Sequence, residues 1–450
     1  NRIFVEGNNA AALGAVYGGA TVCAWYPITP SSSLAEAFQS HCKRLRHDKD
    51  GKAKYAIVQA EDELASIGIV IGAGWNGSRA FTSTSGPGIS LMTEFIGLAS
   101  FAEVPAVIVN VQRGGPSTGM PTRTQQSDLL SCAYASNGDT KHVLLFPEDP
   151  KECFDFTADA LDLADRLQTP VFVMTDLDIG MNHRLCAPFE WDDSKVYDRG
   201  KVMTAEQLQT ASAKFGRYLD VDGVGMNHRL CEPFVWDEKR VYDRGKVMTA
   251  ADLDAGKTFG RYLDVDGDGI PFRTYPGTHP TKGSYFTRGT TKDEYARYSE
   301  EGAVYVRNME RLQKKFDTAR RIAPQPVRYS APKATRFGVI YFGSTSPAMA
   351  EALDHLEADG HHVNALRVRA FPFAQAVEDF IHEHDKVFVV EQNRDGQLRS
   401  MIMNEFTLDA RKLVPVLHYD GTPITARFIA ADIAKKLSQF KVVPFEKAAS

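Results

Sequence analysis

Residues 54–92, KYAIVQAEDELASIGIVIGAGWNGSRAFTSTSGPGISLM, hold the pattern that decides the fold class. Two runs of β-branched and aromatic residues, 54–60 and 78–84, end in polar or glycine-containing turns, as buried strands do. A helical stretch at 61–74 separates them, and another follows at 89–101. Because a strand, a helix and a second strand in this order form a parallel pair with the helix on one face, the stretch predicts an α/β fold.

The same alternation extends over residues 1–180, which we predict to be one domain. Further strand-like runs occur at 105–111, 141–147 and 169–176. A helical stretch occupies 150–166, with Pro150 just inside its start. The strands are almost continuously apolar, so we expect a parallel sheet covered by helices on both sides.

The rest of the chain divides into two parts. Residues 331–450 repeat the strand–turn–helix style and predict a second, smaller α/β domain. Residues 181–330 are interpreted as an extended excursion and linker over the surface. They contain a tandem repeat, because residues 181–225 recur with few changes as residues 226–269. Two copies are too few to form a solenoid, so a local duplication or an error in the sequence explains them better.

The composition, 43% hydrophobic residues with a formal net charge of −5, is that of an ordinary globular protein. It gives no reason to expect nucleic acid or an anionic membrane as a partner. The longest apolar runs have the length of strands and are too short to span a membrane. The sequence starts without Met and without a secretory signal, so we expect a cytoplasmic protein that is one piece of a larger product.

No metal site is expected in this chain. Its six cysteines are scattered without a C-x-x-C pair, which favours reduced, buried thiols over zinc or iron–sulfur ligation. The stretch LDVDGDG places Asp264, Asp266 and Asp268 at the spacing of a calcium loop. However, Tyr275 stands where such a loop needs a bidentate Glu, so we expect a carboxylate-rich turn instead.

Three loops at predicted strand ends are candidates for a binding site. Glu61, Asp62 and Glu63 lie where a strand meets a helix, and acids there are also explained by the helix macrodipole. The loops at 83–92 and 111–128 are rich in glycine, and the second adds Arg113. Since α/β sheets bind ligands at the carboxyl ends of their strands, the three loops together predict a site at that edge.

These stretches resemble the α subunit of 2-oxoacid:ferredoxin oxidoreductases, most closely the 2-oxoglutarate:ferredoxin type. The resemblance covers nearly the whole chain and is carried by residues 7–19, 26–36, 59–73, 82–92, 112–128, 259–290, 391–398 and 418–425. They include the segments YPITPSSSLAE and QRGGPSTGMPTRTQQSD. Two features depart from the family: the duplicated unit, whose first copy looks like the insertion, and the lack of the γ domain that precedes this region in many relatives.

The resemblance implies a fold and a shared cofactor. The first domain would be the pyrimidine-binding domain of a thiamine diphosphate enzyme, followed by a transketolase C-terminal-like domain. Thiamine diphosphate would lie at an interface with a β subunit, which would hold the diphosphate, Mg²⁺ and a [4Fe–4S] cluster. In this chain Gly267-Asp268-Gly269 only begins the metal fingerprint, because the next Asn is Asn308.

The resemblance also assigns roles to residues. Glu63 matches the family's activating glutamate, which hydrogen-bonds the aminopyrimidine ring and favours its imino form. Thr29, in a loop that Pro27 and Pro30 keep rigid, and Arg113 would bind the substrate's 2-oxo carboxylate. Pro27, Ile28 and Ser85 would line the cofactor site, and Ser31 or Ser32 would cap the following helix.

We therefore expect the α subunit of an enzyme that oxidatively decarboxylates 2-oxoglutarate to succinyl-CoA and passes electrons to ferredoxin. The expected partners are the β subunit, a γ domain or subunit, ferredoxin and coenzyme A. Two alternatives stay open. The substrate could be pyruvate or a branched-chain 2-oxoacid, or the chain could be a non-catalytic interaction subunit of the same fold.

Overall fold

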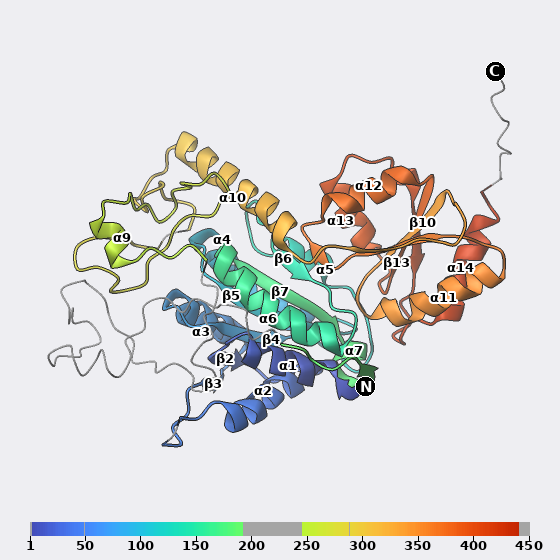
Figure 1. Cartoon of the computed structure of the whole chain (residues 1–450), viewed down its shortest axis with the longest axis horizontal. Coiled ribbons are helices and arrows are strands. Elements are labelled where there is room, and N and C mark those ends of the chain that lie inside the picture. The colour runs from blue at the N-terminus through green and yellow to red at the C-terminus, as the bar shows by residue number, and fades with distance from the viewer. Residues whose placement is uncertain (1, 49, 192–244, 288, 441–450) are drawn as a thin grey trace.

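The structure, a computed structural model, describes residues 2–48, 50–191, 245–287 and 289–440 (Figure 1). Two sheets organise these residues. One has seven strands in the order β12-β6-β7-β5-β4-β2-β3, and the other has five in the order β14-β13-β10-β11-β9. Within these two sheets, every strand pair is parallel except those made by the edge strands β12 and β9. The predicted α/β class, with two successive parallel sheets, is confirmed.

The first sheet consists of β2 (Val22–Trp25), β3 (Ala56–Gln59), β4 (Ala80–Thr84), β5 (Ala106–Gln112), β6 (Val143–Leu145), β7 (Pro170–Asp176) and β12 (Ala370–Phe371). Its helices are α1 (Gly7–Tyr17), α2 (Ser32–Leu45), α3 (Glu63–Trp75), α4 (Gly86–Ala102), α5 (Leu129–Ala133), α6 (Pro150–Leu167) and α7 (Leu177–Met181). Alternate residues of β5 and β7 enter two different apolar clusters, one with α3 and α4 and one with α1, α2 and α6. The sheet is therefore covered on both faces, as its apolar strands predict.

The second unit, residues 327–440, contains β9 (Val327–Tyr329), β10 (Phe337–Tyr341), β11 (Asn364–Arg367), β13 (Lys386–Glu391) and β14 (Leu413–Leu417). Its helices are α11 (Ser346–Ala358), α12 (Gln375–Glu383), α13 (Gln397–Glu405) and α14 (Ala426–Leu437), with short turns η1 (Gly343–Thr345) and η2 (Ala410–Lys412). The unit docks firmly on the first sheet. Its β12 pairs with β6, and its Phe342 and Phe371 join the same apolar cluster as Ile108 and Phe172.

The segment between the two sheets packs on the first unit. At its start, β8 (His183–Cys186) pairs antiparallel with β1 (Ile3–Glu6). After α9 (Ala250–Asp254) comes a long helix, α10 (Gly302–Ile322). The sequence interpretation of 181–330 as an extended excursion misses this helix. Residues 192–244, which include most of the first repeat copy and the start of the second, lie outside the described residues.

The acidic turn at 263–269 is a hydrogen-bonded loop. The Asp264 carboxylate accepts backbone N–H groups of Gly267, Asp268 and Gly269. Lys246 forms ion pairs with Asp266 and Asp268 at 2.6 and 2.8 Å. The carboxylates are thus engaged within the protein, as a carboxylate-rich turn predicts. Among the described residues, no group of three or more His, Cys, Asp or Glu side chains is arranged to hold a metal ion.

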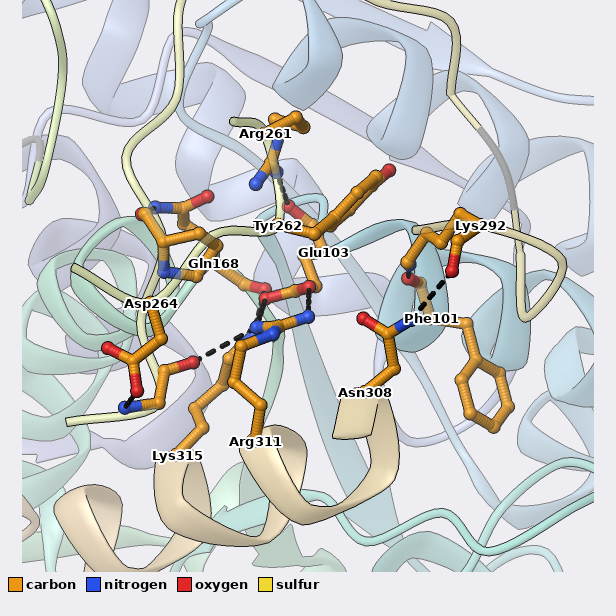
Figure 2. Close-up of polar contacts among 12 residues, drawn as sticks. Phe101, Glu103, Gln168, Arg261, Tyr262, Asp264, Lys292, Asn308, Arg311 and Lys315 are labelled. Atoms are coloured by element: carbon orange, nitrogen blue, oxygen red, sulfur yellow. Dashed lines mark hydrogen bonds and ion pairs between the residues drawn. The ribbon is translucent and has the colours of Figure 1, made fainter. Parts of the chain in front are cut away.

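A buried ion cluster joins α10 to the first unit (Figure 2). Arg311 and Lys315 rise from α10 toward Glu103, which follows α4 and has no exposed surface. Arg311 Nη1 donates to Glu103 Oε2 at 3.0 Å, and Lys315 Nζ donates to the same oxygen. Burial alone would raise the pKa of Glu103, but the charges of Arg311 and Lys315 outweigh it and hold that pKa below its ordinary value.

The same cluster satisfies the C-terminal end of α4. Its last carbonyl groups lack partners within the helix. Lys292 Nζ donates to Phe101 O, and Arg261 Nη2 donates to Glu103 O at 2.7 Å. Tyr262 lies between them, with Lys292 Nζ 3.7 Å from its ring centroid. Because cations are favoured at a helix C-terminus, the segment at 261–315 fixes α4 at this end.

The described part of the chain contains neither a disulfide bond nor a helix suited to spanning a membrane. Its five cysteines are buried and unbridged, and Cys231 lies outside it. No helix in it has both the length and the apolar character needed to cross a bilayer.

Glycines on α1 allow close packing against α6. A Cβ atom at Gly14 would lie 2.2 Å from Phe154 O, which belongs to the backbone and cannot move aside. At Gly18 it would lie 2.8 Å from the Cα of Ala158. The small-residue composition of residues 7–19 therefore brings two backbones together.

We predict that Gly14→Ala lowers the free energy of unfolding by about 2 kcal/mol or more, because the added methyl group overpacks the α1–α6 contact. Gly72→Ala is the matched control. A Cβ at this exposed helical position meets nothing within 4 Å, so alanine should raise stability by up to about 1 kcal/mol. Urea unfolding of both variants measures the difference. Equal stability of the two variants would contradict the packing argument.

Candidate functional site

The loop between β2 and α2 carries Thr29 and is held in place by hydrogen bonds from the side chain of Asn8. The Asn8 side-chain amide donates to Pro30 O and to Ser33 Oγ, both at 2.8 Å. The Thr29–Pro30 peptide bond is cis. Asn8 is 1% exposed. The sequence analysis did not identify it, because its partners lie far away along the chain.

The predicted helix cap by Ser31 or Ser32 is wrong. Ser31 occupies the N-cap position of α2, but its hydroxyl donates to Ile28 O at 3.1 Å instead of accepting a helix N–H. Ser32 Oγ accepts the N–H of Ile28 at 3.0 Å. Both hydroxyls therefore fold the loop back on itself, which leaves Pro27 and Thr29 exposed at its surface.

Glu63 begins α3 at the carboxyl end of β3. Asp62 is the N-cap, with its carboxylate accepting Ala65 N–H at 2.7 Å. Of the three consecutive acids, Glu63 is the buried one, with 6% exposure. Burial raises the pKa of the Glu63 carboxyl group, and the positive charge of Arg113 only partly opposes this shift. Glu63 therefore holds a proton more readily than an ordinary glutamate.

A tight turn at the start of α4 packs against Glu63. A Cβ atom at Gly88 would lie 2.8 Å from Glu63 Cγ and 1.9 Å from Thr84 Oγ1, so this position requires glycine. Ser85, three residues earlier, is fully buried at the N-cap of α4. Its hydroxyl makes no hydrogen bond within the described residues. The region thus offers a protonatable carboxyl group and a buried hydroxyl without a partner.

These groups fit the aminopyrimidine ring of thiamine diphosphate. Such a ring presents both nitrogen acceptors and an amino donor. A protonated Glu63 carboxyl group can donate and accept hydrogen bonds, and the Ser85 hydroxyl can do the same. A buried polar atom without a partner costs free energy unless a ligand satisfies it. Among the described residues, no group of three or more His, Cys, Asp or Glu side chains that could hold a metal ion accompanies them.

Arg113 follows β5 and meets the Thr29 loop. Its Nη1 donates to Thr29 O at 2.6 Å, and the residue is 5% exposed. Its Nε is buried and makes no hydrogen bond to any described residue. The charges of Arg113 and Glu63 also act on each other: Arg113 opposes the rise in the pKa of Glu63, and Glu63 opposes the fall in the pKa of Arg113. The structure thus brings Thr29, Glu63 and Arg113 to one edge of the sheet, with Ser85 on the turn behind Glu63.

Asp128 is a site residue that the sequence interpretation missed. Its Oδ2 accepts from Asn110 Nδ2 at 3.1 Å, and a Cβ at Gly86 would lie 2.7 Å from its Oδ1. Burial raises the pKa of the Asp128 carboxyl group to about 6, although Asn110 and Arg113 oppose the shift. It is the largest source of negative charge acting on Arg113. Asp128 closes the 112–128 stretch, which is the only sequence signal that could have drawn attention to it.

The chain matches a known family model. Residues 13–228 match the family model described as pyruvate flavodoxin/ferredoxin oxidoreductase, thiamine diphosphate-binding. This range contains Thr29, Glu63, Ser85 and Arg113.

Two curated proteins illustrate the similarity. The chain is 46% identical over 212 residues to the 2-oxoglutarate synthase subunit KorA of Methanothermobacter thermautotrophicus, covering 47% of this chain and 54% of that protein. It is 32% identical over 447 residues to the alpha subunit of 2-oxoacid:ferredoxin oxidoreductase 2 of Aeropyrum pernix, covering 96% of this chain and 60% of that protein. The chain therefore spans little more than half the length of these relatives.

A solved structure is also similar. It is the 2-oxoglutarate:ferredoxin oxidoreductase from Magnetococcus marinus with 2-oxoglutarate, coenzyme A and succinyl-CoA bound. The TM-score is 0.77 at 28% sequence identity, over 97% of this chain and 65% of that chain.

We predict that Asp128→Asn stabilises the protein more at pH 7 than at pH 4. The folded pKa of about 6 lies above the unfolded value, so the folded state of the unchanged protein loses stability as pH rises through this window. Asparagine does not titrate, and the stability difference should grow by about 3 kcal/mol across the window. Urea unfolding at several pH values measures it. The exposed Asp139→Asn is the control, and a pH-independent difference for Asp128→Asn would refute the argument.

Proposed function

Because the chain belongs to the family of 2-oxoacid:ferredoxin oxidoreductase alpha subunits, we propose that it builds one wall of a thiamine diphosphate site that decarboxylates a 2-oxoacid. The observation that carries the proposal is the meeting of Glu63, Thr29 and Arg113 at one edge of the first sheet. An acid and a guanidinium at the same edge of the sheet suit a cofactor ring and an anionic substrate.

Glu63 would hold the cofactor's aminopyrimidine ring. When bound, thiamine diphosphate supplies the nucleophilic carbon and the electron sink for decarboxylation. Burial raises the pKa of the Glu63 carboxyl group, which favours sharing a proton with a ring nitrogen. The Ser85 hydroxyl, Pro27 and Ile28 would line the same site.

Arg113 would bind the substrate carboxylate. Its guanidinium keeps Nη1 on Thr29 O, which leaves other N–H groups for a charge-assisted, bidentate contact. The Thr29 hydroxyl, on the exposed loop next to it, would donate to the same carboxylate or to the 2-oxo group. The Thr29 loop does not need to reorganise, because Asn8 already fixes it.

We further propose 2-oxoglutarate as the substrate and coenzyme A and ferredoxin as co-substrates. The names of the Methanothermobacter and Magnetococcus relatives support this choice. A β subunit would supply the diphosphate and Mg²⁺ site and a [4Fe–4S] cluster, and a γ domain or subunit would complete a cytoplasmic complex. The relatives' designation as alpha subunits supports a hetero-oligomer.

Copurification with its partners tests the proposal. The complex should reduce a viologen dye when given 2-oxoglutarate, coenzyme A and thiamine diphosphate, and it should lose this activity when any one is omitted. A panel with pyruvate and branched-chain 2-oxoacids decides the substrate. If none of the tested 2-oxoacids supports dye reduction by the complex, a non-catalytic role is favoured.

We predict that Glu63→Gln lowers kcat by about 100-fold or more, because an amide cannot exchange the proton that the ring nitrogen requires. Steady-state dye reduction at saturating cofactor measures the loss. Glu61→Gln is a matched control, since Glu61 is an exposed neighbour outside the site. Near-normal turnover of Glu63→Gln would remove the proposed mechanism.

We predict that Arg113→Lys raises KM for the 2-oxoacid by about 10-fold or more despite the conserved charge. Lysine is a point charge that cannot hold Thr29 O and bind a carboxylate in a bidentate manner at once. Initial-rate kinetics over a range of 2-oxoacid concentrations measure the change. The exposed Arg44→Lys serves as the control, and an unchanged KM in Arg113→Lys would exclude a bidentate role.

A further inference from the structure

Arg113 is braced by a segment that runs back beside it, residues 123–128. At one end, Gly114 N–H donates to Arg123 O at 2.9 Å. At the other, Asp128 N–H donates to Gln112 Oε1 at 3.0 Å. The residues on both sides of Arg113 are therefore bonded to this return segment. Its position sets that of Arg113.

The second unit holds the outer side of the return segment. Thr124 N–H donates to Gly421 O at 3.2 Å. Ser127 O accepts from Gln397 Nε2 at 2.7 Å, and Gln397 Oε1 accepts Leu130 N–H at 3.2 Å. The contacts come from loops and helices that follow strands of the second sheet.

Gln126 is at the centre of these contacts and is 1% exposed. Its N–H donates to Gln392 O at 2.8 Å, and its carbonyl accepts from Asn393 Nδ2 at 3.0 Å. Its side-chain amide donates to Asp176 and to Ser344, both at 3.1 Å. Asp176 ends β7 of the first sheet, whereas Ser344 belongs to the second unit.

The network around Gln126 is closed by the second unit. Ser344 Oγ donates to the Asp176 carboxylate and accepts from Gln392 Nε2 at 2.8 Å. Each of these residues is less than 5% exposed. In a buried network of this kind, removing one member leaves its partners unsatisfied, so the arrangement is held as a whole.

We propose that the second unit positions Arg113 for the substrate, and that Gln126 is the positioning residue that couples them. Gln126 does not reach the substrate site itself; it fixes the return segment between Asp176 on one side and Gln392 on the other. The second sheet is thereby part of the substrate site without contributing a group to it. This inference rests on the proposed role of Arg113.

Two single variants and one rescue test the coupling in the purified complex. Gln392→Ala and Gln126→Glu each break the network, the second by placing a carboxylate against Asp176. The double variant Gln126→Glu/Asp176→Asn exchanges the amide and the carboxylate, so the amide at position 176 can donate to the carboxylate at position 126. Gln375→Ala is the control, because Gln375 is an exposed glutamine of the same unit.

Both single variants should raise KM for the 2-oxoacid by about 10-fold while kcat and KM for coenzyme A change by less than a factor of about three. The double variant should recover most of the loss. Hydrogen–deuterium exchange should increase in peptides covering 112–128 and stay unchanged in those covering α3. A purely structural role would instead lower kcat and raise KM for coenzyme A as much as KM for the 2-oxoacid, which would overturn the proposal.

The exchange measurement separates this inference from the proposed function. If no 2-oxoacid supports turnover, the proposed function fails, but exchange at 112–128 still reports whether the second unit holds the return segment. Unchanged exchange there in folded Gln392→Ala and Gln126→Glu would overturn the coupling whatever the activity.

Discussion

The ion pairs made by the buried carboxylate of Glu103 are the interactions on which the placement of α10 and of the end of α4 depends. The carboxylate is fully enclosed and draws Arg311 and Lys315 of α10 into the interior. A charge buried in this way is tolerated only when it is paired and hydrogen-bonded. The pairing commits α10 and the segment before it to one place on the first unit, and the segment supplies Lys292 and Arg261 to the end of α4. Figure 2 shows how these groups converge.

The helix that Glu103 terminates begins at the candidate site. Its first turn carries Gly88, which packs on Glu63, and its last carbonyl groups are held by cations. Since a helix is a stiff element, fixing its far end restricts its first turn as well. The opposite side of the site is controlled in a similar way, because the second unit holds the return segment beside Arg113. Thr29 and Arg113 lie on loops that are fixed by buried polar contacts from elsewhere in the chain, whereas Glu63 is the first residue of helix α3.

This arrangement explains what the sequence could and could not predict. The alternation around residues 54–92 and the acids at the strand end were readable, because they are local and follow the periods of strands and helices. Helix α10 was missed because its buried face contains Asn308, Arg311 and Lys315, so several of its buried positions are polar and do not mark a core-facing stripe in the sequence. Asn8, Gln126 and Asp128 act through partners distant in sequence, which no local pattern encodes. Ser31 and Ser32 are residue types that often cap helices, but here their hydroxyls hydrogen-bond the backbone of Ile28 in the preceding loop instead.

The electrostatics of the site also follow from its construction. Two acids, Glu63 and Asp128, act on one guanidinium. If both were fully ionised, they would neutralise Arg113 and repel an anionic substrate. Burial raises the pKa of each acid, so each accepts a proton more readily when another negative charge approaches. On the proposed function, the burial that lets Glu63 share a proton with a ring nitrogen also keeps the charge of Arg113 available for a carboxylate.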